Sequence, residues 1–447
     1  MSLPDYRRYV TPAIFALTIF SLVWRQGKPF LTSTLKPFEV FLVALFLLIL
    51  FEFIISAESR SLWYSLKSTR VLYGMLLGAL CLFMLIGSIS VFSKWLLFAP
   101  QVYLGYANIA LAILVFFIST YVVIRHERGL RWGLLAMLTS PLLFFAAFVP
   151  RWESFFIDNA RLVGMQDDPN ITASFIAISL LIASVLYLYR ESHLRWLGVF
   201  HIVLVTPLFL WTNSRGSILA FVASFILLLI LYLSQGFSRE RTKAIFILFC
   251  LFIFSISMAF IVLPKDTQIS IYERSIRPVL SNENLREIVV KDWILEGDNE
   301  LYASFYKDTQ IDSFDISRGD LWRQGLDNII KSPLGFGPAY QNWNPIQHGK
   351  GAHNFWLQVP LTAGWGGFLL WIIFLGVVSR NAIKISKKKD FIGITLSIIF
   401  LFFLISGIFI DILTLKGLWF IMGMIVGYAT LELSGAERSN STQGFEL

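Results

Sequence analysis

The sequence is poor in charged residues and in the residues that usually build disulfides or metal sites. Only 15% of its 447 residues are charged, and it contains two cysteines and five histidines. Both cysteines, Cys81 and Cys250, lie inside apolar stretches, where a small buried residue is the simplest interpretation. This pattern argues against a disulfide framework and against a cysteine-rich metal centre, and it leaves the redox compartment open.

Acidic residues are also absent from the segment between Arg25 and Pro37, which joins the first two apolar stretches. A hard divalent cation needs several oxygen ligands, and most of them come from carboxylates. The acidic residues between Pro264 and His353 do not show the ligand spacing of a calcium loop. We therefore expect neither a metal ion nor another cofactor.

Apolar residues dominate the chain instead. They make up 56% of the sequence, which contains 42 phenylalanines and has a mean hydropathy of +0.68, as is typical of a protein embedded in lipid. An apolar run of about 20 residues is long enough to cross a bilayer as a helix. Such runs predict twelve spans, at residues 9–24, 37–56, 71–93, 98–124, 132–149, 171–189, 196–212, 216–235, 244–263, 354–379, 391–410 and 417–433. The expected fold is an all-α polytopic membrane protein.

The distribution of the 37 Lys and Arg residues predicts the orientation of these spans. If the N-terminus is cytoplasmic, the inner segments hold more than twice as many of these residues as the short outer segments, which contain only Arg25, Lys28, Lys36, Lys94, Arg151, Arg161, Arg215 and Lys416. The positive-inside rule then places both termini in the cytoplasm. This topology explains the net charge of +8, which gives no reason to expect nucleic acid as a partner.

The same topology divides the chain into four parts. Residues 1–263 hold the first nine transmembrane helices, and residues 264–353 form one large periplasmic loop. Residues 354–433 hold the last three helices, and residues 434–447 form a cytoplasmic tail. Only the loop is long enough for a small subdomain, and its amphipathic patterns predict short helices there.

One loop helix is predicted to begin at Ser317, which forms a helix start with Asp320, and to end before Pro333. Arg318 falls in the first turn of this helix, where the unpaired N–H groups are already positive. A cation at that position favours the binding of an anion. We therefore interpret the region where the loop meets the tenth span as a phosphate site. The apolar residues of the helix recur on one face: Leu321, Trp322, Leu326, Ile329 and Ile330.

Asp168 and Asn170 lie at the start of the sixth span. Asp168 is expected to cap this helix, and Pro169 is expected to be its first residue. The alternative is that Asp168 or Asn170 orients a substrate hydroxyl at the outer surface.

Arg215 lies in a very short hairpin between the seventh and eighth spans. Asn213 or Ser214 is expected to cap the eighth span, which leaves Arg215 in its first turn with apolar sequence on both sides. An arginine at such a boundary is costly unless it snorkels or pairs. We therefore interpret Arg215 as a functional residue.

The histidines have different expected roles. His126 and His193 lie in basic inner loops and are expected to be solvated. His201 lies within the seventh span and is expected to make a polar contact between helices. His348 lies in a turn rich in Gly and Asn and is a substrate-binding candidate.

His353 opens the tenth span, and Asn354 follows it as a substrate-binding candidate. Arg215, Arg318 and His353 are each expected to begin a different helix. The positive N-termini of these three helices would point at the same outer boundary of the membrane. The two arginines can hold phosphate oxygens in a bidentate manner. The positive surroundings disfavour imidazolium, so a neutral His353 can accept a proton. A lipid diphosphate is the anion that fits this depth.

Four motifs occur along the chain in this order: Asp168-Pro169-Asn170, Thr212-Asn213-Ser214-Arg215-Gly216, Arg318…Trp322…Pro333-Leu334-Gly335-x-Gly337 and His353-Asn354…Gly364-x-Gly366-Gly367. In order and in topological position they resemble motifs of the bacterial O-antigen ligase/polymerase family. The resemblance covers roughly residues 160–430. Asp411 matches only loosely an acidic position that the family has after the eleventh span.

The resemblance implies a GT-C-like membrane glycosyltransferase that is inverting and independent of metals. It implies that Arg215 and Arg318 bind the diphosphate of a glycan donor linked to undecaprenyl diphosphate, and that His353 activates the acceptor hydroxyl. It also implies a place in the bacterial inner membrane, among membrane lipids, with the active site facing the periplasm. Ligation to a lipid A-core acceptor is favoured over polymerisation onto a glycan acceptor, because a polymerase must hold two lipid carriers and the sequence supplies one convincing group of cations.

Two other classes of protein are open from the residues alone. A flippase for lipid-linked glycans, or another transporter, would suit twelve spans, but transporters usually show internal repeats and broken helices near the bilayer midplane. The polar candidates here crowd one face instead. A structural membrane scaffold would leave Arg215 unexplained.

Overall fold

The computed structural model describes residues 3–22, 37–57, 59–61, 67–91, 100–148, 156–157, 161–162, 168–189, 193–262, 318–338, 354–410 and 415–433. Each of the twelve predicted spans coincides with a helix, and one more helix lies in the predicted loop. In chain order the helices are α1 (Leu3–Ser21), α2 (Pro37–Ile55), α4 (Lys67–Val91), α5 (Pro100–Arg125), α6 (Glu127–Phe148), α7 (Pro169–Tyr189), α8 (His193–Trp211), α9 (Arg215–Leu233), α10 (Arg239–Val262), α14 (Arg318–Lys331), α16 (Phe355–Ser386), α17 (Phe391–Ser406) and α18 (Lys416–Leu433). Two short strands, β1 (Phe156–Ile157) and β2 (Arg161–Leu162), pair antiparallel with Phe156 opposite Leu162.

Most of the described helices have the length and composition of membrane spans. Eight of those described are long and apolar enough to cross a bilayer, namely α2, α4, α5, α7, α8, α9, α10 and α16. Large apolar side chains such as Ile54, Ile253 and Leu369 are exposed on α2, α10 and α16, as helices that face lipid require. The prediction of an all-α polytopic membrane protein is confirmed. Cys250 was expected to be buried, but it is exposed. The reason is that only one face of α10 packs against the bundle.

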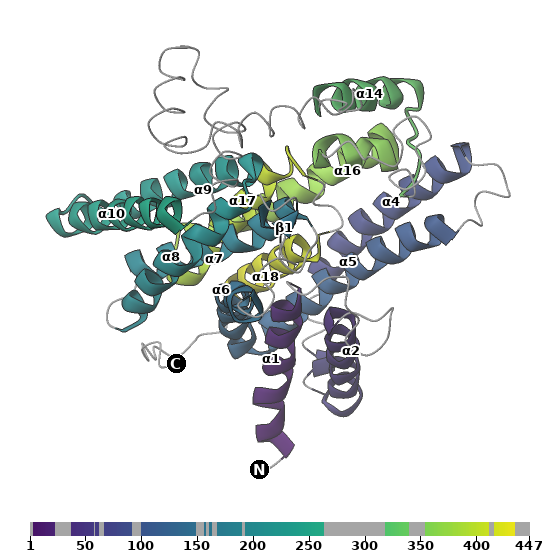
Figure 1. Ribbon diagram of the computed structural model, residues 1–447. Coiled ribbons are helices and arrows are strands. Elements are labelled where there is room, and N and C mark those ends of the chain that lie inside the picture. The colour runs from purple at the N-terminus through teal and green to yellow at the C-terminus, as the bar shows by residue number, and fades with distance from the viewer. Residues whose placement is uncertain are drawn as a thin grey trace.

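The middle of the bundle is formed by α7, α17 and α18 (Figure 1). Most side chains of α7 and α18 are buried on every side of the helix. α18 packs along α5 at close range, since a Cβ on Gly423 would overlap the Ser119 hydroxyl and the Phe116 carbonyl. At this crossing the Thr120 hydroxyl donates to the Gly423 carbonyl at 3.2 Å. Small residues that allow such approach are typical of helix contacts in membranes.

α16 is broken into two segments at Gly364. This residue has φ 66° and ψ −176°, a conformation that is essentially restricted to glycine. The ring centroids of Phe355 and Trp371 are 5.5 Å apart, whereas a straight helix would separate these two residues by about 24 Å. The segment before Gly364 is therefore folded back against the segment after it. The predicted span 354–379 needs correction, because only Trp365–Ser386, about 33 Å long, forms a straight helix of membrane-spanning length.

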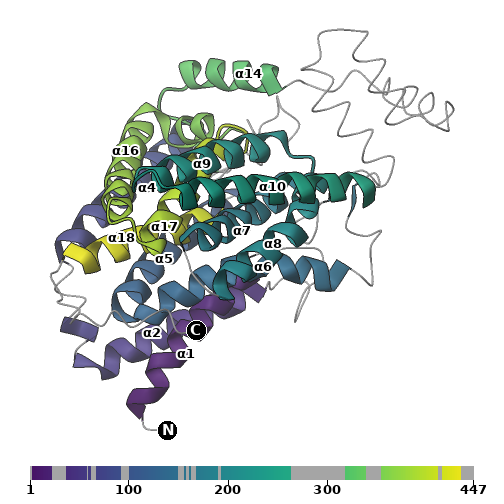
Figure 2. The same cartoon turned by 90° about the vertical axis from the view of Figure 1, so that its left-hand side faces the viewer.

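α14 lies over α16, at the opposite side of the molecule from α1 (Figures 1 and 2). It begins at Arg318 and ends before Pro333, as predicted. Ile329 is buried against Leu361 of α16. Leu326 and Ile330, which belong to the same apolar face, are 47% and 72% exposed. The reason is that only part of the apolar face of α14 contacts α16.

The turn after α14 is joined to the break in α16 by backbone hydrogen bonds. The N–H groups of Phe336 and Gly337 donate to the carbonyls of Leu361 and Thr362 at 2.7 and 2.9 Å. A third bond runs from the Trp365 N–H to the Pro333 carbonyl at 3.0 Å. The break leaves backbone N–H and carbonyl groups of α16 without their partners in the helix. The bonds to the turn after α14 replace the bonds that are lost. The glycines of the third and fourth motifs therefore form the joint between α14 and α16.

A buried polar cluster lies where α1, α2, α5 and α6 meet. Glu52 is 3% exposed and accepts hydrogen bonds from Thr11 and, at 3.1 Å, from His126 Nε2. The expectation that His126 is solvated was wrong, because its side chain turns inward to the carboxylate that α2 carries within an apolar run. His201 is 1% exposed, and its Nε2 has no hydrogen-bond partner among the described residues, so the expected polar contact at that atom is not found there.

Candidate functional site

The start of α7 is capped as predicted. Asp168 Oδ1 accepts from the backbone N–H groups of Asn170 and Ile171 at 2.7 and 3.4 Å, and Pro169 is the first helical residue. One carboxylate oxygen of Asp168 is thereby engaged in holding the helix end. This contact supplies the N-terminal donors of α7 with an acceptor from the same chain.

Asn170 connects α7 to the hairpin that precedes α9. The Ser214 hydroxyl donates to Asn170 Oδ1 at 2.8 Å and lies 3.0 Å from the Ser217 hydroxyl. Ser214 occupies the N-cap position of α9, but its side chain makes no capping bond there. The expected side-chain cap is absent because the hydroxyl is directed across to Asn170. Asn213 has a positive φ of 47°, which an asparagine tolerates and which makes the sharp turn possible.

Arg215 is the first residue of α9, and its side chain is exposed although both neighbours in the chain are buried. Within the described residues, no hydrogen bond or ion pair holds its guanidinium group. Because Ser214 leaves the N-terminus of α9 without a side-chain cap, backbone N–H donors and a cation are presented together. Such a combination suits an anion.

The start of α9 is pressed against the chain that follows α17. A Cβ on Gly216 would overlap the Phe409 side chain, so only glycine allows this approach. Phe409 lies two residues before Asp411, which is outside the described residues. The sequence-predicted Arg215 is therefore adjacent to the segment that leads to Asp411.

The start of α16 also contacts this part of the chain. Asn354 is the N-cap of α16, and its side chain accepts from the Leu357 N–H at 3.2 Å. The Phe355 N–H donates to the Gly407 carbonyl at 2.8 Å, and Trp356 Nε1 donates to the Leu404 carbonyl at 3.3 Å. The C-terminal end of α17 and the residues that follow it thus contact the starts of both α9 and α16.

The structure therefore gathers four of the predicted site residues at one end of the bundle: Asp168, Asn170, Arg215 and Asn354. Arg318 begins α14 as predicted, but only its backbone is described. His348, His353 and Asp411 lie outside the described residues. Since α16 begins at Phe355 with Asn354 as its cap, His353 precedes the cap rather than opening the helix.

Gln358 belongs to this region and was missed from the sequence. It is 1% exposed, and neither polar atom of its amide has a hydrogen-bond partner among the described residues. Its backbone N–H bonds to the Asn354 carbonyl at 2.8 Å, so it lies one helical turn after the cap. A buried amide without partners is destabilising by about 1–3 kcal/mol. The available signal was a glutamine within an apolar run, where a polar side chain is costly unless it finds a partner.

The fold is that of an all-α polytopic membrane protein, and polar side chains and the exposed Arg215 lie together at one end of its helices. A family model described as O-antigen ligase matches residues 200–372, which include Arg215, Arg318, His353 and Asn354. This match supports the resemblance of the motifs to the O-antigen ligase/polymerase family. No curated protein matches the chain significantly. The family implies a membrane enzyme of the glycosyltransferase type and, in general, substrates that are lipid-linked glycans.

Proposed function

We propose that this protein is an O-antigen ligase, which transfers a glycan from undecaprenyl diphosphate to a lipid A-core acceptor at the periplasmic face of the bacterial inner membrane. The observation that supports this most strongly is the exposed Arg215 at the uncapped start of α9, inside the matched family region. An exposed cation with free backbone donors suits the diphosphate of a lipid-linked donor.

The proposed reaction is an inverting displacement that needs no metal. The acceptor hydroxyl oxygen attacks the anomeric carbon on the face opposite the diphosphate, and the bond from that carbon to the diphosphate oxygen breaks. His353 accepts the proton of the hydroxyl as a general base. Arg215 and Arg318 stabilise the negative charge that develops on the departing diphosphate. Loss of a general base typically lowers the rate by ~10²- to 10⁴-fold.

The joint between α14 and α16 supports this assignment of roles. α14 carries Arg318 at its start, and the turn after α14 is bonded to α16 on both sides of Gly364. α16 begins one residue after the Asn354 cap, which directly follows His353. The same hydrogen-bonded connection thus joins the helix that carries a proposed phosphate ligand to the helix that follows the proposed base in the chain.

Gln358 and Asn170 are proposed to contact the sugars of the donor or the acceptor. Gln358 has two unpaired amide atoms in a buried position beside the start of α16. Asn170 accepts a hydrogen bond from Ser214 through its side-chain oxygen and is partly exposed. Amide side chains in such positions are suited to bind sugar hydroxyl groups.

Polymerisation of O-antigen repeat units is the second candidate function. It would need a second group of cations for the second lipid carrier. Lys416 at the start of α18 lies at the end of the bundle where α17 ends, and its Nζ is 3.1 Å from Asn108 Oδ1. This lysine could contribute to a second group of cations. A single lysine does not form such a group, so the ligase remains the favoured function.

Deletion of the gene in the native host, followed by gel analysis of lipopolysaccharide, tests the ligase proposal. The expected result is lipid A-core without long glycan chains, together with polymerised glycan that accumulates on the lipid carrier. Core that bears a single repeat unit would instead show a polymerase. Unchanged lipopolysaccharide would contradict both.

The proposed orientation has a separate test. In a variant without Cys81 and Cys250, a cysteine introduced by Asn299→Cys should react with a membrane-impermeant maleimide in intact spheroplasts. The matched Lys388→Cys variant should react only after the membrane is opened. The reverse pattern would place the site on the cytoplasmic side.

A further inference from the structure

One row of apolar side chains on α14 is left uncovered when this helix docks on α16. Leu326 and Ile330 are exposed, and so is Leu334 in the turn that follows the helix. Trp322 lies one helical turn before Leu326 and is half-buried. Large apolar side chains that remain exposed together usually mark a contact surface. We call Trp322, Leu326, Ile330 and Leu334 the α14 stripe.

A row of charged residues runs beside the α14 stripe. Arg323, Asp327 and Lys331 are exposed, and each directly follows a stripe residue in the chain. One residue turns an α-helix by about 100°, so the two rows lie about a quarter turn apart. Ile329, which is buried against Leu361, lies on the other side of the stripe. α14 thus presents a buried side, an apolar side and a charged side in succession around its axis.

The turn after α14 fixes the height of the stripe relative to the membrane helices. A Cβ on Gly105 of α5 would lie 3.0 Å from the Pro338 carbonyl oxygen, so the turn is pressed against α5 at this level. Gly105 is about 30 Å along the helix from Arg125, at the end of α5 that the charge distribution predicts to be cytoplasmic. The hydrocarbon core of a bilayer is also about 30 Å thick. The turn, and the stripe that leads into it, therefore lie at the opposite boundary of the membrane.

Trp365 joins the α14 stripe to the exposed apolar side of α16. Its backbone N–H donates to the carbonyl of Pro333, the residue before Leu334, and its side chain is 48% exposed. Leu369, one helical turn further along α16, is exposed as well. Tryptophan is enriched where membrane helices meet the interface with water. The stripe therefore continues into surface that faces lipid.

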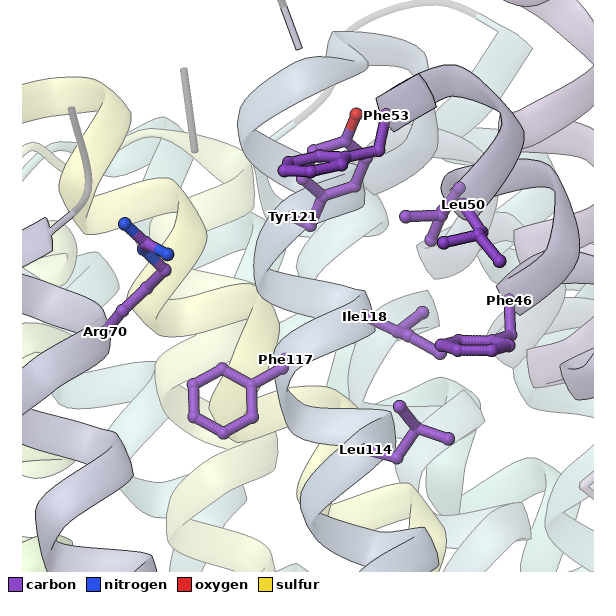
Figure 3. Close-up of a pocket in the computed structure, with 9 residues that line it drawn as sticks. Phe46, Leu50, Phe53, Arg70, Leu114, Phe117, Ile118 and Tyr121 are labelled. Atoms are coloured by element: carbon purple, nitrogen blue, oxygen red, sulfur yellow. The ribbon is translucent and has the colours of Figure 1, made fainter. Parts of the chain in front are cut away.

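α5 provides a second lipid-facing surface that reaches the turn. Leu104, the neighbour of Gly105, is exposed. Further along α5, Leu114 lines an apolar space of about 510 Å³, which Phe46 and Leu50 of α2 line from the other side (Figure 3). Water in such places would find almost no hydrogen-bond partners, whereas hydrocarbon would lose none. Lipid is therefore the occupant that fits the apolar surface on both helices that the turn contacts.

We infer that the α14 stripe binds the bilayer at this boundary, which the charge distribution predicts to be that of the outer leaflet. The apolar side chains enter the upper part of the acyl chains, and the charged row stays at the level of the lipid headgroups, as in amphipathic helices that rest on a membrane interface. Arg323 and Lys331 have long side chains that can reach the phosphates from there. This contact with lipid does not depend on the proposed transfer reaction.

Spin labelling of the full-length protein in nanodiscs of phosphatidylethanolamine and phosphatidylglycerol tests this inference. In a variant without Cys81 and Cys250, Ile330→Cys and the matched Asp327→Cys each carry one label. Collisions with oxygen, which concentrates in lipid, and with a water-soluble nickel chelate report what surrounds the label. The label at residue 330 should collide several-fold more often with oxygen than the label at residue 327, and several-fold less often with the chelate.

The other occupants of the stripe give different results. Equal access of the chelate to both labels would show that the stripe faces water. Low access of both reagents at residue 330 would show that protein covers it, either another part of this chain or a second copy. Either result would overturn the inference, and Leu326→Cys repeats the measurement if the first variant does not fold.

Leu369→Cys provides the reference for depth. This position lies four residues beyond Trp365, about 6 Å further into the membrane along α16. Its ratio of oxygen to chelate collisions should therefore exceed the ratio at residue 330. Equal ratios at the two positions would place α14 within the hydrocarbon instead of at the boundary, and the inference of an interfacial helix would be wrong. None of these measurements requires transfer activity, so they are decided separately from the proposed function.

Discussion

The replacement Gly364→Ala should disconnect the loop helix from the tenth span. Gly364 has φ 66° and ψ −176°, and an alanine held there is strained by about 1–3 kcal/mol. The added Cβ would also lie 2.5 Å from the Pro333 carbonyl oxygen and 2.5 Å from the Leu334 carbonyl carbon. Both neighbours are backbone atoms, so they cannot move away as a flexible side chain could.

Two effects of this replacement are expected. The melting temperature in detergent should fall by several degrees, because strain and overlap together exceed about 2 kcal/mol. Release of glycan from its lipid carrier should fall more strongly, because the turn bonded to Gly364's neighbours positions α14 and hence the backbone of Arg318. The two measurements can be made on the same purified protein.

Gly376→Ala in the same helix provides the matched control. A Cβ at Gly376 would have no heavy atom within 4 Å, so this replacement should leave activity unchanged and raise stability by up to about 1 kcal/mol through helix propensity. If the two alanine variants melted at the same temperature and were equally active, the break at Gly364 would not be a joint, and the argument that α14 is held through it would be wrong.

The other predictions concern the site itself. His353→Ala, Arg215→Ala and Arg318→Ala should each abolish transfer in the same glycan-release assay while the melting temperature stays unchanged, and Arg→Lys should restore little because a point charge lacks the planar fork; activity within about twofold of the unmodified protein would remove that residue from the mechanism. Gln358→Leu should raise the melting temperature, since it removes a buried unpaired amide worth about 1–3 kcal/mol, and should lower transfer; a stabilised variant with full activity would show that Gln358 contacts no substrate. Transfer should persist in excess EDTA, and loss of activity that magnesium or manganese restores would overturn the metal-free reaction.

The helices of this protein could be predicted because a bilayer imposes a local rule. An uninterrupted apolar run in a bilayer must form a helix, so each of the twelve predicted spans coincides with a helix, and eight of the described helices have the length and composition to cross a membrane. The cap at Asp168 and the start of α14 at Arg318 are equally local, since they depend on the few residues around each helix end. The order of the motifs also indicated the family that the matched region supports.

Contacts between distant segments had no such local signal. The Ser214 hydroxyl could have capped its own helix, and only the position of α7 directs it to Asn170. His126 looked solvated because its sequence neighbours are basic, but helix packing brings the carboxylate of Glu52 to within 3.1 Å of it. Periodicity placed Leu326 and Ile330 on an apolar face of α14, whereas docking decided which part of that face is buried.

The break in α16 shows this division most clearly. The sequence contains Gly364 and its glycine neighbours, and a glycine in an apolar run is compatible with a straight helix in a membrane. Only the hydrogen bonds from the turn after α14, at residues 333–337, replace the bonds that the helix loses at Gly364 and make the folded-back form stable. The sequence by itself thus determined the helices and the residue types of the site. The tertiary structure decided which helix ends meet, because each such contact depends on partners that lie far apart along the chain.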